Sequence, residues 1–140
     1  MRKISANYIF PGDKPPLKYG ILICDDSGYI KDLIDTGGKL KESAGLEYYN
    51  GIIVPGFVNA HCHLELSWLK GKIKEKTGIG PFIGEINRLR REQPDNAEYK
   101  IKNADSLLYS SGTLAAGDIS NFASSVDAKK ESKIFYHTFV

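Results

Sequence analysis

The 140-residue sequence contains only two cysteines, Cys24 and Cys62, which are too few for a disulfide framework. No apolar run approaches the roughly 20 residues that a membrane-spanning helix needs. The apolar residues near the start of the chain are interrupted by Ser5 and Asn7, so they do not form the core of a secretory signal. These absences predict a protein of a reducing compartment, the cytoplasm, with no membrane partner.

An excess of one charge is also missing, because 19 Lys and Arg residues face 17 Asp and Glu residues. A domain that binds nucleic acid normally shows a stronger or more clustered basic excess. The densest basic group is Arg88, Arg90 and Arg91, which we interpret as the solvated end of a helix. The sequence therefore predicts no nucleic-acid partner, while 41% hydrophobic and 26% charged residues are typical of a folded globular chain.

The first part of the chain, residues 1–55, has the pattern of short strands. Apolar residues alternate between Ile4 and Phe10, and the polar segment 25–28 separates two further apolar runs as a hairpin turn would. Further strands are expected at 20–24, 29–34 and 48–54, with an irregular charged stretch at 39–42. We expect an antiparallel β unit, separate from the rest of the chain.

The second part, residues 56–140, predicts alternating strands and helices. Strands are expected at 57–64, 113–119 and 134–140, and helices after Gly80-Pro81, after Asp95 and at 125–131. Asp95 and Glu98 have the spacing of a capping box for the second of these helices. This order is typical of a parallel sheet with right-handed crossovers, which places this part in the α/β class.

Two histidines end the first of these strands. Residues two apart on a strand point to the same side, so His61 and His63 should project together and Cys62 should face away. Two imidazoles on one side of a strand can share a divalent metal ion. The alternative is a pair of polar residues at a strand end near solvent, because so short a motif has many false matches.

The residues around the histidines extend the pattern. Segment 55–67 reads Pro-Gly-Phe-Val-Asn-Ala-His-Cys-His-Leu-Glu-Leu-Ser, and segment 112–120 contains Gly112-Thr113 and Gly117-Asp118-Ile119-Ser120. Together they resemble the N-terminal portion of the amidohydrolase superfamily, in the branch of cytosine-deaminase-like and aminofutalosine-deaminase-like enzymes. The resemblance covers essentially the whole chain and is most specific at residues 54–67.

The resemblance implies a fold and a chemistry. Residues 1–55 would be the N-terminal share of a small antiparallel β-sandwich, and residues 56–140 would supply about three strands of a (β/α)8 barrel. His61 and His63 would be the first two ligands of one divalent metal ion, with zinc as the first expectation and iron, manganese or nickel as alternatives. The metal would activate water for the hydrolytic deamination of an aminated heterocycle, a small-molecule substrate.

Several neighbouring residues have two readings. Glu65 is expected to bind a polar group of the substrate, or else to be a solvated residue just beyond the strand. Asp118 is expected to join a network around a ligand histidine, or to be a capping aspartate. Core packing is favoured for Trp68, a structural role for His137 and a small buried apolar role for Cys62.

The resemblance also implies that residues needed for catalysis lie outside this sequence. The family takes its remaining ligands and its glutamate acid/base from later barrel strands, so no catalytic acid/base is assigned here. We therefore expect the isolated 140-residue chain to be inactive, and copies of the chain to associate over the open sheet edge. Two alternatives stay open: an amide or cyclic-amide hydrolase of the same superfamily, and a non-catalytic module that binds a partner or self-associates.

Overall fold

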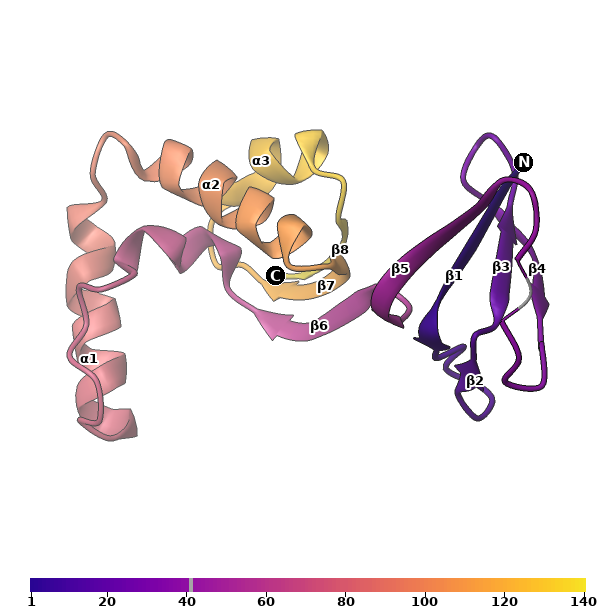
Figure 1. The fold of residues 1–140 in the computed structure, drawn as a ribbon. Coiled ribbons are helices and arrows are strands. Elements are labelled where there is room, and N and C mark those ends of the chain that lie inside the picture. Colours follow the sequence, from indigo (N-terminus) through magenta and orange to yellow (C-terminus); the bar gives the residue numbers. More distant parts are fainter. Residues whose placement is uncertain (41) are drawn as a thin grey trace. The chain divides into compact units, whose positions relative to one another are not determined.

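The computed structural model describes residues 1–40 and 42–140, which divide into two compact units, Met1–Pro55 and Gly56–Val140 (Figure 1). Each unit has a β-sheet of its own. Part of the predicted irregular stretch 39–42 is Lys41, which lies outside the described residues. Within the described ranges, no helix has the length and apolar character needed to cross a membrane.

The first unit is a five-stranded sheet built around its first strand. Its strands are β1 (Arg2–Ile9), β2 (Leu17–Lys18), β3 (Ile21–Cys24), β4 (Ile30–Ile34) and β5 (Leu46–Ile53). β2 and β3 pair with β1 in antiparallel fashion, and β3 pairs with β4 in the same way. The predicted turn between β3 and β4 forms around Asp25, whose carboxylate accepts hydrogen bonds from the backbone N–H of Ser27 and of Tyr29.

The expectation of an antiparallel unit is wrong for one strand. β5 pairs with β1 in parallel, with Lys3 opposite Leu46 and Ile9 opposite Ile53. The β3–β4 hairpin leaves β4 at one edge, so the chain must cross back to the free edge of β1, where it arrives in the direction of β1. The result is a single mixed sheet, since alternation identifies a strand but not its partner.

The second unit contains a parallel sheet of three strands in the order β6, β7, β8. The strands are β6 (Phe57–Cys62), β7 (Thr113–Ile119) and β8 (Phe135–Phe139). The α-helices are α1 (Ile79–Leu89), α2 (Ala97–Ser110) and α3 (Val126–Glu131), and the short 3₁₀ helices are η1 (Leu64–Leu69), η2 (Arg90–Glu92) and η3 (Ala123–Ser125). The predicted α/β alternation is confirmed, but β6 ends earlier than predicted and η1 follows it.

The predicted capping box of α2 does not form. Asn96 occupies the N-cap position, and no side chain accepts a capping hydrogen bond there. Asp95 therefore lies one residue outside the position from which its carboxylate would reach the first turn. The helix is stabilised instead by its buried face, which includes Ala97 and Ile101.

Helices α2 and α3 lie on one face of the second sheet (Figure 1). Ile101 of α2 and Ala128 of α3 form a buried cluster with Leu64, and Tyr136 of β8 packs against it. Because side chains alternate along a strand, Phe135 and Phe139 point to the opposite face, where they are 72% and 53% exposed. The sheet thus has one face covered by helices and one open face.

Gly117 occupies the middle strand where β6 comes closest. A Cβ atom at this position would lie 2.7 Å from the carbonyl oxygen of Ala60 and 3.6 Å from the ring of Phe139. The first distance is too short for a carbon–oxygen contact, and the contacting atom is backbone, which cannot rotate away. Glycine at this position therefore lets the backbone of β6 pass close to β7 just before the histidines, where the register of the two strands shifts.

We predict that Gly117→Ala lowers the free energy of unfolding by about 1–3 kcal/mol, the usual cost of forcing extra atoms into a packed site. Gly84→Ala is the matched control, because a Cβ at this position of α1 meets no atom within 4 Å. Alanine in a helix interior should raise the free energy of unfolding by about 0.5–1 kcal/mol. Urea denaturation followed by circular dichroism measures both, and equal stability of the two variants would contradict the close approach.

Candidate metal-binding site

His61 and His63 come together at the end of β6. Their ring centroids lie 5.1 Å apart with the rings edge to face. His61 is exposed and His63 is half-buried. The thiol of Cys62 points to the other face of the sheet, where it lies 3.3 Å from an oxygen of Asp118. The geometry expected from the two-residue spacing is therefore present, and a metal-binding role for the pair remains a prediction.

One ring nitrogen of His63 is bound to the protein. Nδ1 lies 3.0 Å from the carbonyl oxygen of Ile119, the last residue of β7. A carbonyl oxygen can only accept, so Nδ1 carries the proton and donates it. In the neutral ring Nε2 then keeps its lone pair, which is the form of histidine that ligates metals.

Cys62 does not supply a thiolate to this site. Burial, and next the hydrogen bond to the Asp118 carboxylate, raise the pKa of Cys62 to about 12. The thiol therefore stays protonated at neutral pH, whereas metal binding requires the thiolate. The expected small buried apolar role is met only in part, because Cys62 is half-buried and its thiol donates to Asp118.

Asp118 is fully buried near the C-terminal end of β7. One carboxylate oxygen accepts the backbone N–H of Leu64 at 2.7 Å, and the other accepts the Ser120 hydroxyl at 2.7 Å and pairs with Lys129. Burial alone would raise the pKa of Asp118, but these hydrogen bonds and the Lys129 ammonium outweigh it and hold the pKa below its usual value. Asp118 thus binds the backbone N–H of Leu64, next to His63, and not the His63 imidazole.

Glu65 lies in η1 and is 2% exposed, so the reading of a solvated residue is wrong. Its Oε2 accepts the backbone N–H groups of Asn121 and Phe122 at 3.0 and 2.9 Å, and its Oε1 accepts the Asn121 side-chain amide at 3.0 Å. The guanidinium of Arg90 lies 3.6 Å from Oε1. The substrate-binding role of Glu65 remains a prediction, and the structure adds that both oxygens hold the loop after β7.

The interpretation of the arginine group as wholly solvated is also wrong for Arg90. Its side chain is 24% exposed and turned toward Glu65, whereas the Arg88 side chain is 54% exposed and pairs with Glu85 and Glu92 on the helix surface. The end of α1 turns into η2 at this point, and that turn moves Arg90 off the solvent face.

Trp68 and His137 both take part in packing contacts. Trp68 is 3% exposed and packs with Ile86 and Leu89 of α1, which confirms the expected core role. His137 is exposed on β8, where its ring packs edge to face on Phe139 at 4.6 Å between centroids.

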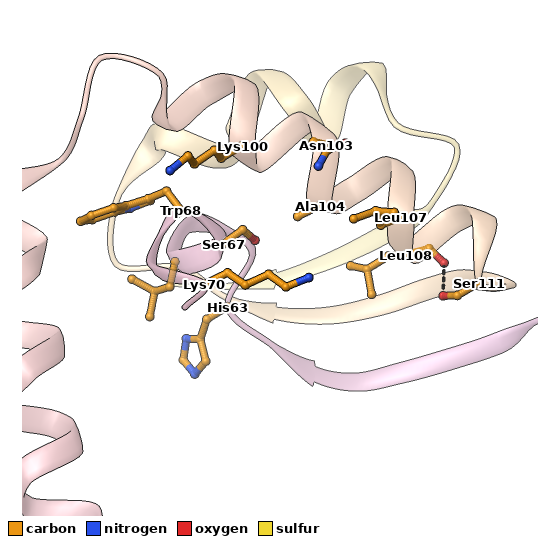
Figure 2. Close-up of a pocket in the computed structure, with 11 residues that line it drawn as sticks. His63, Ser67, Trp68, Lys70, Lys100, Asn103, Ala104, Leu107, Leu108 and Ser111 are labelled. Atoms are coloured by element: carbon orange, nitrogen blue, oxygen red, sulfur yellow. Dashed lines mark hydrogen bonds between the residues drawn. The ribbon is translucent and has the colours of Figure 1, made fainter. Parts of the chain in front are cut away.

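A cavity of about 700 Å³ lies beside His63, between η1 and α2. Figure 2 shows the His63 ring at one end, turned away from α2, and the ammonium groups of Lys70 and Lys100 along the cavity. The rest of the lining is mostly apolar: Leu66, Trp68, Ala104, Leu107 and Leu108, with Ser67, Asn103 and Ser111. Among the described residues that line the cavity none is acidic, so these residues supply no further carboxylate ligand.

Sequence reasoning missed the residues that support the site from a distance. Asn121 contacts Glu65 because the loop after β7 lies against η1, and Lys129 contacts Asp118 because α3 packs on the sheet. No spacing in the sequence marks these contacts. Across residues 1–40 and 42–140, His, Cys, Asp and Glu side chains form no group of three or more arranged to hold a metal ion.

No model of a known protein family matches the chain. An adenosine deaminase of Helicobacter pylori is 31% identical over 116 residues, which is 83% of this chain and 28% of that protein. The crystal structure of Helicobacter pylori aminofutalosine deaminase in complex with methylthio-coformycin covers all of this chain with a TM-score of 0.74 at 23% identity. An atrazine chlorohydrolase from Arthrobacter aurescens complexed with zinc covers 99% of this chain with a TM-score of 0.65 at 20% identity.

The chain spans only about a third of these proteins. It corresponds to 35% of the aminofutalosine deaminase chain and to 35% of the chlorohydrolase chain. At these identities the two solved structures show that the fold is shared, while the sequence relative connects the chain to a deaminase.

We predict that Glu65→Gln lowers the free energy of unfolding by about 2–4 kcal/mol, because the amide keeps one acceptor and places an NH₂ group against buried donors. The matched control is Glu85→Gln, since Glu85 is an exposed partner of Arg88 and its loss should cost less than about 0.5 kcal/mol. Urea denaturation measures both variants. If Glu65→Gln proved as stable as Glu85→Gln, the carboxylate would not be holding the loop.

We also predict that Cys62 reacts slowly with iodoacetamide at pH 8. A thiol with a pKa of about 12 carries about 10³-fold less thiolate than an ordinary cysteine at this pH. The measurement uses the Cys24→Ala variant, so that Cys62 is the only thiol, and compares the folded chain with the chain in urea. A folded-state rate within tenfold of the unfolded-state rate would contradict the raised pKa.

Proposed function

Because the relatives of this chain are deaminases and hydrolases of the amidohydrolase superfamily, we propose that it is the part of such a hydrolase that carries the first two metal ligands. In this proposal the reaction is the hydrolytic deamination of an aminated heterocycle. Strands β6, β7 and β8 are then the first three strands of a (β/α)8 barrel, and the histidines lie at the carboxyl end of the first, where barrel active sites are found.

The observation that carries the proposal is the pairing of the two imidazoles. His61 and His63 approach to 5.1 Å at the end of one strand, and the Ile119 carbonyl fixes the His63 tautomer that leaves Nε2 available. Cys62 and Asp118 face the opposite side of the sheet and are bound to each other. The donor set offered at this strand end is therefore two imidazole rings, which suits zinc or another divalent transition metal.

A divalent ion bound there would supply a Lewis acid that lowers the pKa of a bound water to near neutrality. The chain's own contribution is to hold His63 in one orientation and to keep the Cys62 thiol protonated and out of the site. In the proposed reaction, water adds to the ring carbon that bears the amino group, the C–N bond breaks, and ammonia leaves. Glu65, if it contacts substrate, would do so from a carboxylate that also anchors the loop of Asn121 and Phe122.

The proposal gives the 140-residue chain only half of a catalytic site. Catalytic zinc normally has three protein ligands and a water, and His61 and His63 supply two. A general acid/base contributes roughly 10²–10⁴-fold to the rate, and we propose that a later segment of a longer form supplies it. We therefore infer that activity requires a longer form of the protein.

The test compares the 140-residue chain with a form extended to the length of the relatives. Zinc is measured by elemental analysis after dialysis, and ammonia release is measured on adenosine-like, cytosine-like and cyclic-amide substrates. We expect weak binding and no turnover for the short chain, and about one zinc ion per chain with ammonia release for the long form. His61→Ala or His63→Ala in the long form should remove the zinc ion and the activity.

His137→Ala is the matched control, because this histidine is exposed on β8 and its ring packs on Phe139. It should keep both zinc and turnover. Ring opening of a cyclic amide without ammonia release would favour the amide-hydrolase alternative. Retention of zinc by the His61→Ala and His63→Ala variants would overturn the assignment of the ligands, and tight zinc with turnover in the short chain would show that copies assemble a complete site.

A further inference from the structure

The ammonium group of a mostly buried lysine connects α3 to the ends of two strands. Lys129 is 10% exposed, and its Nζ lies 3.0 Å from the Ser120 hydroxyl and 3.0 Å from the Thr138 hydroxyl. It also forms an ion pair with Asp118, which has no exposed surface, and lies 5.6 Å from the ring centroid of Tyr136. Lys129 therefore holds the carboxylate from behind, on the face of the sheet covered by helices.

The same carboxylate holds the chain that follows the second histidine. Asp118 Oδ2 forms an ion pair with Lys129 and accepts a hydrogen bond from the Ser120 hydroxyl. Oδ1 accepts a hydrogen bond from the backbone N–H of Leu64, 2.7 Å away. An ionised oxygen accepts such a hydrogen bond about twice as strongly as a neutral one. The charge on Lys129 thus supports a contact made one residue after His63.

Two consecutive residues of β7 hold two consecutive residues after β6. Asp118 binds the N–H of Leu64, and the carbonyl of Ile119 accepts the Nδ1 proton of His63 at 3.0 Å. The two bonds fix the backbone beside the ring and the ring itself. A shift of the Leu64 amide would carry His63 with it and lengthen the bond to Ile119.

Stability alone does not explain a buried ion pair at this place. Burying two charges costs several kcal/mol for each ion, and an apolar pair of similar volume is often as stable. The exposed pair of Lys130 with Asp127 on the same helix, by contrast, leaves its carboxylate in water. The Lys129–Asp118 pair differs because its carboxylate bonds directly to the segment that carries the histidines.

We propose that Lys129 and Asp118 are positioning residues that set the tautomer and orientation of His63. Lys129 orients the carboxylate, Asp118 holds the Leu64 amide, and the His63 ring then donates from Nδ1 to Ile119 and presents a bare Nε2. That Nε2 of His63 binds a metal ion rests on the proposed function. The arrangement itself can be tested without metal.

The test is ¹⁵N NMR of the histidine rings in the metal-free 140-residue chain, because the shifts of a protonated and a bare ring nitrogen differ widely. In the unchanged chain His63 should be a single tautomer with the proton on Nδ1. Lys129→Met should give a mixture of His63 tautomers while leaving His137 unchanged. Lys130→Met is the matched control on α3, since Lys130 is exposed and pairs with the exposed Asp127, and it should leave His63 as it is.

A zinc titration of the same samples separates the two hypotheses. We expect Lys129→Met to weaken zinc binding about 10-fold, the effect usually seen when a group that supports a metal ligand is lost. A tautomer change without zinc binding in either the short chains or the extended form would support positioning and count against the proposed function. A single unchanged His63 tautomer in folded Lys129→Met would overturn the proposal. A His63 proton on Nε2 in the unchanged chain would also overturn it, and that measurement does not depend on the folding of any variant.

Discussion

The candidate site depends on a carboxylate that stays ionised without any contact to solvent. Asp118 is fully buried, and it keeps its charge because hydrogen bonds from Leu64 and Ser120 and the ammonium of Lys129 replace the lost water. That charge ties β7 to the start of η1, to the thiol of Cys62 and to α3. The orientation of His63 follows from these links, since its ring is bound to the neighbouring residue of the same strand.

A second buried carboxylate fixes the other side of η1. Glu65 collects the backbone N–H groups of Asn121 and Phe122, while Arg90 approaches from the end of α1. Two carboxylates therefore hold η1 in place. Asp118 of β7 accepts a hydrogen bond from the backbone N–H of Leu64, the first residue of η1, and Glu65 of η1 accepts hydrogen bonds from the loop after β7. A short 3₁₀ helix has few internal hydrogen bonds, so these contacts explain how it keeps a defined place next to the histidines.

The sequence was informative where periodicity determines structure. The spacing of His61 and His63 predicted that their rings share a side, and the alternation after Gly56 predicted the parallel sheet with its helices. It did not predict the partner of β5, because a pattern of apolar residues does not state which edge a strand reaches. It also did not predict the burial of Glu65 or the role of Lys129, because both follow from a turn after β6 and a helix that returns over the sheet. These contacts depend on tertiary structure and leave no local signal.

The parallel pairing of β1 with β5 affects how the first unit is made. Lys3 pairs with Leu46, so β1 leaves the ribosome some 40 residues ahead of the strand that covers its free edge. At about 5–20 residues per second, that edge stays uncovered for roughly 2–9 seconds of synthesis. During this interval the nascent chain offers an unpaired strand to any other extended peptide nearby, although the β3–β4 hairpin can already protect the opposite edge. The first unit therefore completes its sheet late in synthesis. Although the unit is small, a chaperone that covers the free edge of β1 would then lower the chance of pairing with another chain.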